Sequence, residues 1–190
     1  MKSKIVLACV ALILTQTCVK PRLSQAADKK AKSAVFTLGG VKYFHRFTEG
    51  DLHEYTPDGQ EDLEAWKDMV TINYYPKAKD GDALAATAEA ALNIYKANRA
   101  KILRTDSVPR TKDKPAEHLI VAVFGRPEFI EVTFARFKMH GGVGTAVIYS
   151  HRGYGKKVGD AMSAWLEKNG PTTEKNLMKW DEMPKVPKSK

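Results

Sequence analysis

The sequence holds only two cysteines, Cys9 and Cys18, and both lie near its N-terminus. If the N-terminal segment is removed, the remaining chain has no disulfide, no thiol nucleophile and no thiolate metal ligand. The sequence also lacks an unbroken apolar stretch of the roughly 20 residues that a membrane-spanning helix needs. A disulfide-stapled fold and a cysteine-dependent enzyme are therefore both excluded for the processed chain.

The first 26 residues have the three parts of a secretory signal peptide. A basic start (Lys2 and Lys4) is followed by the apolar run Ile5–Leu14 and by the small-x-small exit Ser24–Ala26. We therefore predict cleavage after Ala26, or alternatively after Ala27, and an exported protein that is periplasmic or secreted. A retained anchor or lipidation at a cysteine is less favoured, because the apolar run is short and neither cysteine follows a good lipobox.

Removal of the signal leaves about 160 residues with a net charge of about +5. That length suffices to bury one core. We predict a flexible lead-in at 27–34, a single domain at 35–180 and a flexible basic tail at 181–190. The acidic residues are interspersed with the basic ones, so nucleic acid is not an expected partner. An anionic ligand, a cell-envelope component or a protein partner is favoured instead.

Strand and turn signals dominate the first part of the domain. A hairpin is predicted for residues 35–47 around Gly39-Gly40, and a further strand for 52–56. The spacing of Leu63, Trp66 and Met69 predicts a short helix that leads into a strand at 70–75.

The second part alternates helices with a meander of strands. Asp80 or Asp82 is expected to cap a long helix that continues to Ile102, followed by a polar loop at 105–117. Strands are predicted at 118–124, 129–139 and 145–150. A last helix is predicted at 157–168, ending at the Asn-Gly-Pro sequence of 169–171.

This order predicts an α+β fold, a mostly antiparallel sheet packed by a long central helix and a C-terminal helix. The order resembles that of the Mog1/PsbP-like fold over most of residues 35–170. Proteins with that fold mostly bind or assist partners, so the resemblance implies a binding or accessory role. It carries over no site residues.

The densest polar cluster, residues 150–157, is predicted to join the last strand to the last helix. Its glycines would let a backbone approach a ligand, and a helix N-terminus attracts anions. A phosphate, sulfate or carboxylate is the expected ligand, and an ordinary basic connection is the alternative. The predicted ligand-binding residues are His151, Arg152, Tyr154, Lys156 and Lys157.

No metal or cofactor is predicted. The histidines of the processed chain show no H-x-x-x-H or H-x-H spacing, and no P-loop or dinucleotide fingerprint occurs. An assembly of His45 and His53 with His140 or His151 across a sheet is the one alternative route to a metal site.

Catalysis has one weaker candidate set. Glu49, Asp51, His53 and Glu54 crowd one region, where like charges would favour proton transfer by raising a carboxyl pKa. Solvated loop charges are the simpler interpretation. No nucleophile elbow occurs, and the catalytic residues stay unknown.

A recognition surface is predicted around Tyr55 and Asp58, whereas Trp66 and Met69 are expected to pack into the core. Taken together, these features favour a non-catalytic extracytoplasmic binding or accessory domain over an enzyme. The alternative is a small secreted hydrolase that uses His151 or His53 with a carboxylate as acid and base.

Overall fold

The computed structural model describes residues 35–185, all of which lie in one compact unit. The predicted signal peptide (1–26), the predicted lead-in (27–34) and the last part of the predicted tail (186–190) lie outside the described residues. Export and the flexibility of the lead-in therefore stay predictions.

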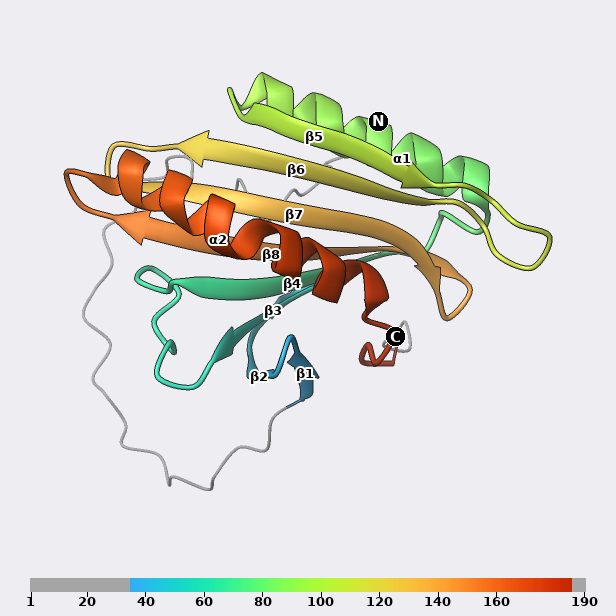
Figure 1. Cartoon of the computed structure of the whole chain (residues 1–190). Helices are drawn as coiled ribbons and strands as arrows, with labels where there is room; N and C mark the ends of the chain where they lie inside the picture. The colour runs from blue at the N-terminus through green and yellow to red at the C-terminus, as the bar shows by residue number, and fades with distance from the viewer. Residues whose placement is uncertain (1–34, 186–190) are drawn as a thin grey trace, which may run out of the picture. The chain divides into compact units, whose positions relative to one another are not determined.

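The described residues form one eight-stranded antiparallel sheet and two helices, which confirms the α+β prediction (Figure 1). The strand order is β1-β2-β3-β4-β8-β7-β6-β5, so the late strand β8 pairs with β4 in the middle of the sheet. The elements are β1 (Phe36–Leu38), β2 (Val41–Glu49), β3 (Leu52–Pro57), β4 (Asp68–Tyr75), α1 (Gly81–Ala97), β5 (Lys101–Val108), β6 (Glu117–Gly125), β7 (Phe129–His140), β8 (Val143–Tyr154) and α2 (Val158–Lys179).

The predicted N-terminal hairpin is present, and its turn uses both glycines. Gly39 and Gly40 have φ values of 58° and 83°, a region that favours glycine. The short helix predicted near Leu63 is wrong, because turns and bends occupy this segment. Trp66 and Met69 are buried as expected, with exposures of 3% and 4%. Their spacing of three reflects a loop followed by a strand.

The long helix begins as predicted but ends earlier. The Asp80 carboxylate accepts a hydrogen bond from the Ala83 amide at 2.8 Å, which caps α1. The chain then leaves the helix at Asn98 and passes through a left-handed Arg99 at φ 61° into β5. The predicted helix to Ile102 and the predicted loop from 105 are both wrong over β5. Most of its side chains are exposed on this edge strand, so no apolar alternation marks it.

The last helix extends well past its predicted end. Pro171 lies inside α2, although an interior proline costs a helix about 3 kcal/mol. Beyond it, Leu177 (0% exposed) and Trp180 (7%) are buried. Full burial of one large apolar side chain contributes about 1.5–3 kcal/mol, so the two together outweigh the proline. Among residues 35–185, neither helix has the length and apolar character needed to cross a membrane.

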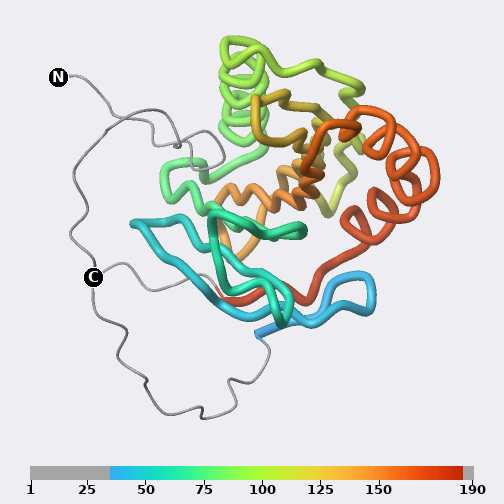
Figure 2. Tube along the Cα trace, turned by 90° about the vertical axis from the view of Figure 1, so that its left-hand side faces the viewer, coloured from blue at the N-terminus to red at the C-terminus, as the bar shows by residue number. Residues whose placement is uncertain are grey.

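The two helices pack on opposite faces of the sheet. A Cβ at Gly153 of β8 would lie 2.8 Å from Val158 of α2, whereas a Cβ at Gly144 would lie 3.4 Å from Leu84 of α1. Figure 2 shows the strands β6 to β8 between the two helices. Alternate residues of β8 therefore point to different helices. The α2 face carries most of the core, with Tyr43, Val70, Ile72, Phe134, Val147, Met162 and Leu177 among its buried members.

The first residues of the predicted tail contact the sheet. Met183 is buried at 9% exposure, and the Pro184 carbonyl accepts a hydrogen bond from the Tyr74 hydroxyl at 3.2 Å. Arg136 on β7 donates to the carbonyls of Leu177 and Trp180 at 2.9 and 2.7 Å, which fixes the end of α2 against the sheet. The flexibility of the tail stays a prediction, and composition alone does not reveal these contacts.

Candidate functional site

The polar cluster at 150–157 is not one loop, as the sequence suggested. Residues up to Tyr154 belong to β8, so alternation divides the cluster between the two faces. His151 lies on the α2 face with Gly153, whereas Arg152 and Tyr154 lie on the other face. The predicted ligand-binding residues therefore do not converge on a single site.

Arg152 is held as a structural cation. Its guanidinium lies 4.0 Å from the centre of the Trp66 ring and 4.1 Å from that of the Phe129 ring. Its Nε donates to Glu131 Oε2 at 2.7 Å, and Glu131 is only 3% exposed. An arginine engaged by two rings and a buried carboxylate is not available to an external anion.

The remaining members of the cluster differ in the exposure and hydrogen bonding of their side chains. The Tyr154 hydroxyl donates to the Trp66 carbonyl at 2.7 Å, although its side chain is 40% exposed. Lys156 and Lys157 are exposed just before α2, and the Lys157 side chain makes no capping hydrogen bond. Of the five predicted residues, these two lysines alone remain as free surface cations.

Of the two residues predicted for a recognition surface, Asp58 is exposed and Tyr55 is not. Tyr55 is buried at 5% exposure on β3, and burial raises its pKa to about 12. Its ring lies edge-on to Phe36 at 4.9 Å, so it belongs to the core. Asp58 is exposed in the turn that follows β3.

The histidines of the alternative metal site, His45 and His53 with His140 or His151, do not form one cluster. His45 Nε2 and His53 Nδ1 both lie within hydrogen-bond distance of Thr48 Oγ1, at 2.7 and 2.8 Å. His140 Nε2 donates to the Pro184 carbonyl, and His151 contacts a carboxylate instead. Over residues 35–185, no group of three or more His, Cys, Asp or Glu side chains is placed to hold a metal ion.

The crowded carboxylates of the β2–β3 hairpin also separate. Glu49 and Asp51 are exposed, and His53 and Glu54 occupy successive positions of β3, so they point to opposite faces. Burial raises the pKa of Glu54, and the nearby Arg152 opposes that rise. This group provides no convergent acid and base.

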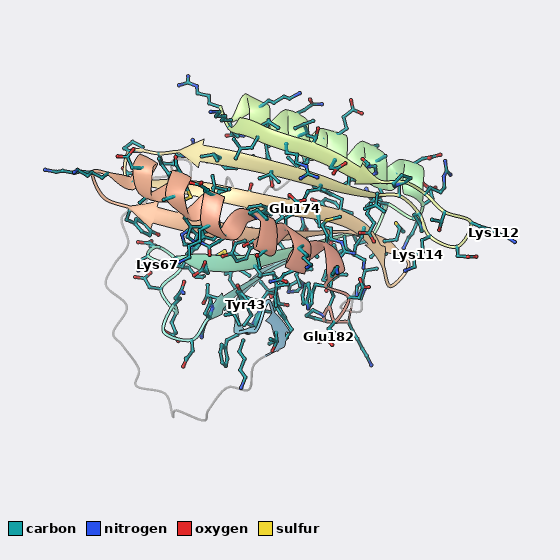
Figure 3. The ribbon with its side chains drawn as sticks, viewed as in Figure 1. Tyr43, Lys67, Lys112, Lys114, Glu174 and Glu182 are labelled. Carbon is teal, nitrogen blue, oxygen red and sulfur yellow. The ribbon has the colours of Figure 1, made fainter. Side chains whose placement is uncertain are left out.

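The structure instead shows a cleft between the β1–β2 hairpin and α2. Its volume is about 300 Å³, at the lower end of the range for small-molecule sites. Figure 3 labels Tyr43 on β2 of the hairpin and Glu174 on α2. The lining residues are Leu38, Gly39, Val41, Tyr43, Asp68, Tyr149, Trp165, Asn169, Thr172, Thr173 and Asn176.

Asp68, the first residue of β4, is the centre of a hydrogen-bond network in this cleft. Its Oδ1 accepts from the Tyr149 hydroxyl at 2.7 Å and from His151 Nδ1 at 2.8 Å. Its Oδ2 has a longer contact, 3.4 Å from Gln60 Nε2. The Gln60 Oε1 also accepts from the backbone amides of Lys67 and Asp68, each at 2.7 Å, which fixes the start of the strand.

This network fixes the charge of the site. Burial raises the pKa of Asp68, but hydrogen bonds from His151 and Tyr149 together lower it below its usual range. Burial, reinforced by the Asp68 charge, raises the pKa values of Tyr43 and Tyr149 well above the ordinary value. An ionised carboxylate only accepts hydrogen bonds, so His151 carries a proton on Nδ1. The cleft thus holds an ionised carboxylate that accepts hydrogen bonds from Tyr149, His151 and Gln60.

Aromatic stacking holds the network against the helix. The Trp165 ring of α2 lies parallel to the His151 ring, with centroids 4.1 Å apart and planes 7° apart. It is also parallel to Tyr149 at 6.3 Å. Trp165 therefore stacks on the rings of both His151 and Tyr149, the two β8 residues that donate hydrogen bonds to Asp68.

Sequence patterns did not single out Asp68, Tyr149 or Trp165. Asp68 and His151 are direct cross-strand partners, but 83 positions separate them in the chain. One signal was available: Asp68 is a charged residue placed at the start of an otherwise uncharged strand. Its partners depend on the register of β4 with β8, which local patterns do not give.

The fold and the cleft define an α+β domain with a ligand-sized cleft beside α2. A protein-family model matches residues 47–181, more than half of the chain, and the protein belongs to that family. The matched region includes the central strands and α2 but begins after most of the hairpin. No curated protein matches the sequence.

Solved structures with a similar arrangement include two of Mog1. A mutant of the protein Mog1 is 12% identical, with 76% of this chain and 88% of that chain covered and a TM-score of 0.41. The Saccharomyces cerevisiae Ran-binding protein Mog1p is 13% identical, with 72% and 81% covered and a TM-score of 0.40. Human STARD10 is 6% identical, with 74% of each chain covered and a TM-score of 0.33. The observed order of elements agrees with the order on which the Mog1/PsbP-like resemblance was based, a long helix before an antiparallel meander and a second helix near the end.

Proposed function

We propose that this protein is an exported, non-catalytic binding domain that holds a small polar ligand in the Asp68 cleft. The observation that carries the proposal is an ionised carboxylate, fixed by Tyr149 and His151, in a cleft of about 300 Å³. Export rests on the signal-like sequence of residues 1–26.

The arrangement of the network supports binding. Placing a charged carboxylate in a half-buried site costs stability unless fixed donors compensate it. Asp68 receives two short hydrogen bonds from side chains that are themselves held by stacking on Trp165. The carboxylate is thus already oriented before a ligand arrives, which lowers the entropic cost of binding.

An anionic ligand at the 150–157 cluster has less support, because Arg152 is engaged by Glu131. Lys156 and Lys157 would still attract an anionic cell-envelope surface through long-range electrostatics. A protein partner also fits a binding domain. In either case, the cleft and the two lysines are separate features that separate variants can test.

The test uses the processed chain, starting at Ala27. Its melting temperature and amide NMR spectrum are recorded with sugars, amino acids, nucleosides, amines, phosphate and an anionic polysaccharide. A ligand that binds only the folded state raises the melting temperature. We expect one class to do so and to shift the Trp165 indole and Asn176 amide signals.

The matched variants are Asp68→Asn in the cleft and Asp58→Asn in an exposed turn. Loss of the response in the first variant alone supports the cleft. Binding that survives Asp68→Asn but disappears in a Lys156→Ala, Lys157→Ala double variant would instead assign the function to the basic loop.

N-terminal sequencing of the exported protein tests processing, and a retained Met1 would contradict export.

A second function, acid and base catalysis by a small hydrolase, is favoured by one contact. Asp68 and His151 come from different strands and meet at 2.8 Å, the geometry in which a carboxylate orients a histidine base. The contact supports this weakly, because the His151 ring is stacked on Trp165 and does not line the cleft. Hydrolysis of ester, phosphate or glycoside substrates that disappears in His151→Gln, with ligand binding retained, would establish this function.

A further inference from the structure

The charge of the Asp68 cleft is unusual for a basic protein. The whole chain carries a net charge of +9. The residues that line the cleft include one acid, Asp68, and no lysine, arginine or histidine. Asp68 is therefore the one charged residue of the lining, and His151, which is not among the lining residues, contacts its carboxylate at 2.8 Å.

The positive side chains near this site point elsewhere. Arg152 follows His151 in β8 but lies on the other face, where Glu131 and two rings hold it. On α2, Thr172 and Thr173 line the cleft, whereas the next residue, Glu174, pairs with Arg104 of β5 at 3.2 Å. Alternation in the strand and periodicity in the helix thus keep the arginines away from Asp68.

The Asp68 carboxylate also has unused acceptor capacity. An ionised carboxylate offers about four acceptor positions. Two are filled by Tyr149 and His151 at Oδ1, and Oδ2 has only the long contact to Gln60. Of these partners, Tyr149 and Gln60 are neutral donors. A ligand with an N–H donor and a positive charge would complete this set with a short, charge-assisted hydrogen bond.

The rest of the lining suits the carbon skeleton of such a ligand. Leu38 and Val41 from the hairpin and Trp165 from α2 offer apolar and aromatic surface, and Asn169 and Asn176 offer amide groups. An aromatic ring also attracts a cation placed over its face. A compact molecule with one apolar part and one ammonium group matches both halves of the lining.

We infer that the ligand of the Asp68 cleft is a small primary amine, bound as its ammonium ion to the Asp68 carboxylate. This inference rests on the proposed function and specifies the chemical class of ligand for the same site. It differs from the anionic ligand that the basic residues of the sequence suggested.

The experiment compares three probes of nearly equal size and different charge: phenethylamine, phenylethanol and phenylacetate. Each is titrated into the chain from Ala27 at neutral pH, with calorimetry for affinity and NMR for the Trp165 indole and Asn176 amide signals. We expect phenethylamine to bind at least tenfold more tightly than phenylethanol and phenylacetate not to bind. This comparison needs no variant, so it stands even if a substitution unfolds the protein.

The same titrations on Asp68→Asn and on the exposed control Asp58→Asn test whether the Asp68 carboxylate is the group that binds the ammonium ion. We expect the first variant to lose at least tenfold in affinity for phenethylamine and the second to be unchanged. Equal affinity for phenethylamine and phenylethanol, or tighter binding of phenylacetate, overturns the amine assignment but leaves the cleft as a binding site. If no probe and no member of the broader panel shifts the cleft signals, the proposed function itself is wrong.

Discussion

The two polar clusters at the end of β8 lie on opposite faces of the sheet, and they differ in how completely their charges are compensated. Around Arg152, a half-buried cation has a carboxylate partner at 2.7 Å, and the Trp66 and Phe129 ring centres lie 4.0 and 4.1 Å from its guanidinium. Around Asp68, a half-buried carboxylate has donors on one oxygen and a cleft beside it. A compensated cluster stabilises the fold, whereas a charge with unused acceptors next to a cavity is available to a ligand. Four sets of substitutions test this distinction.

Arg152→Ala should have the largest effect on stability. Removing the guanidinium leaves Glu131, at 3% exposure, as a buried carboxylate without its partner, which costs about 3–5 kcal/mol. The free energy of unfolding is measured by urea denaturation at pH 7. Adding Glu131→Gln to the variant should recover part of the loss. A loss below about 1 kcal/mol would mean that this cluster is not structural, and the comparison between the clusters would fail.

Asp68→Asn should have a smaller effect that depends on pH. Because the folded-state pKa of Asp68 is lowered, its contribution is present above the unfolded-state pKa and is lost as pH falls through the folded-state pKa. We expect the variant to be less stable by about 1.5–3 kcal/mol at pH 7, since hydrogen bonds to charged groups contribute that much. The difference should shrink toward pH 3 in urea melts. A difference that is constant with pH would show that the Asp68 charge is not stabilised.

Tyr149→Phe and Tyr154→Phe form a matched pair across the two clusters. Each removes one hydroxyl that donates at 2.7 Å, to the Asp68 carboxylate in the first case and to the Trp66 carbonyl in the second. A hydrogen bond to a charged acceptor is about twice as strong as a neutral one. We expect losses of about 2 and 1 kcal/mol in thermal or urea unfolding. Equal losses would indicate that the two acceptors do not differ in charge.

Lys156→Ala with Lys157→Ala should have the smallest effect. Both side chains are exposed at the start of α2, where positive charge opposes the helix dipole. Stability should change by less than about 0.5 kcal/mol, or rise slightly, and amine binding in the cleft should stay unchanged. Loss of amine binding in this variant would contradict the separation of the two features.

The sequence predicted the helices and strands better than it predicted which strands pair with one another. The Gly39-Gly40 turn, the Asp80 cap and the apolar strands at 70–75 and 118–124 have local chemical signals, and all appear in the structure. The exposed edge strand β5 has no such signal and was taken for helix and loop. Pro171 gave a misleading signal, because the burial of Leu177 and Trp180 together outweighs the cost of a proline.

The candidate site was predicted only in part, for a related reason. His151 was selected with Arg152, because both are polar and adjacent in sequence. In the structure the two residues are successive in β8, so their side chains point to opposite faces of the sheet. His151 contacts Asp68 instead. Neither the partner strand of β8 nor its register follows from local patterns, so the carboxylate, the hydroxyl and the indole of the site were not grouped.

The pairing of β4 with β8 also constrains the order in which the domain folds. The hairpin half of the sheet, β1 to β4, joins the other half only through β8, the last strand of the chain. A growing polypeptide therefore cannot complete the sheet until Tyr154 has been synthesised, and long-range pairings of this kind form slowly. For a chain that is exported as we propose, this delay is useful, because a polypeptide that has not closed its sheet can still be threaded through a translocation pore.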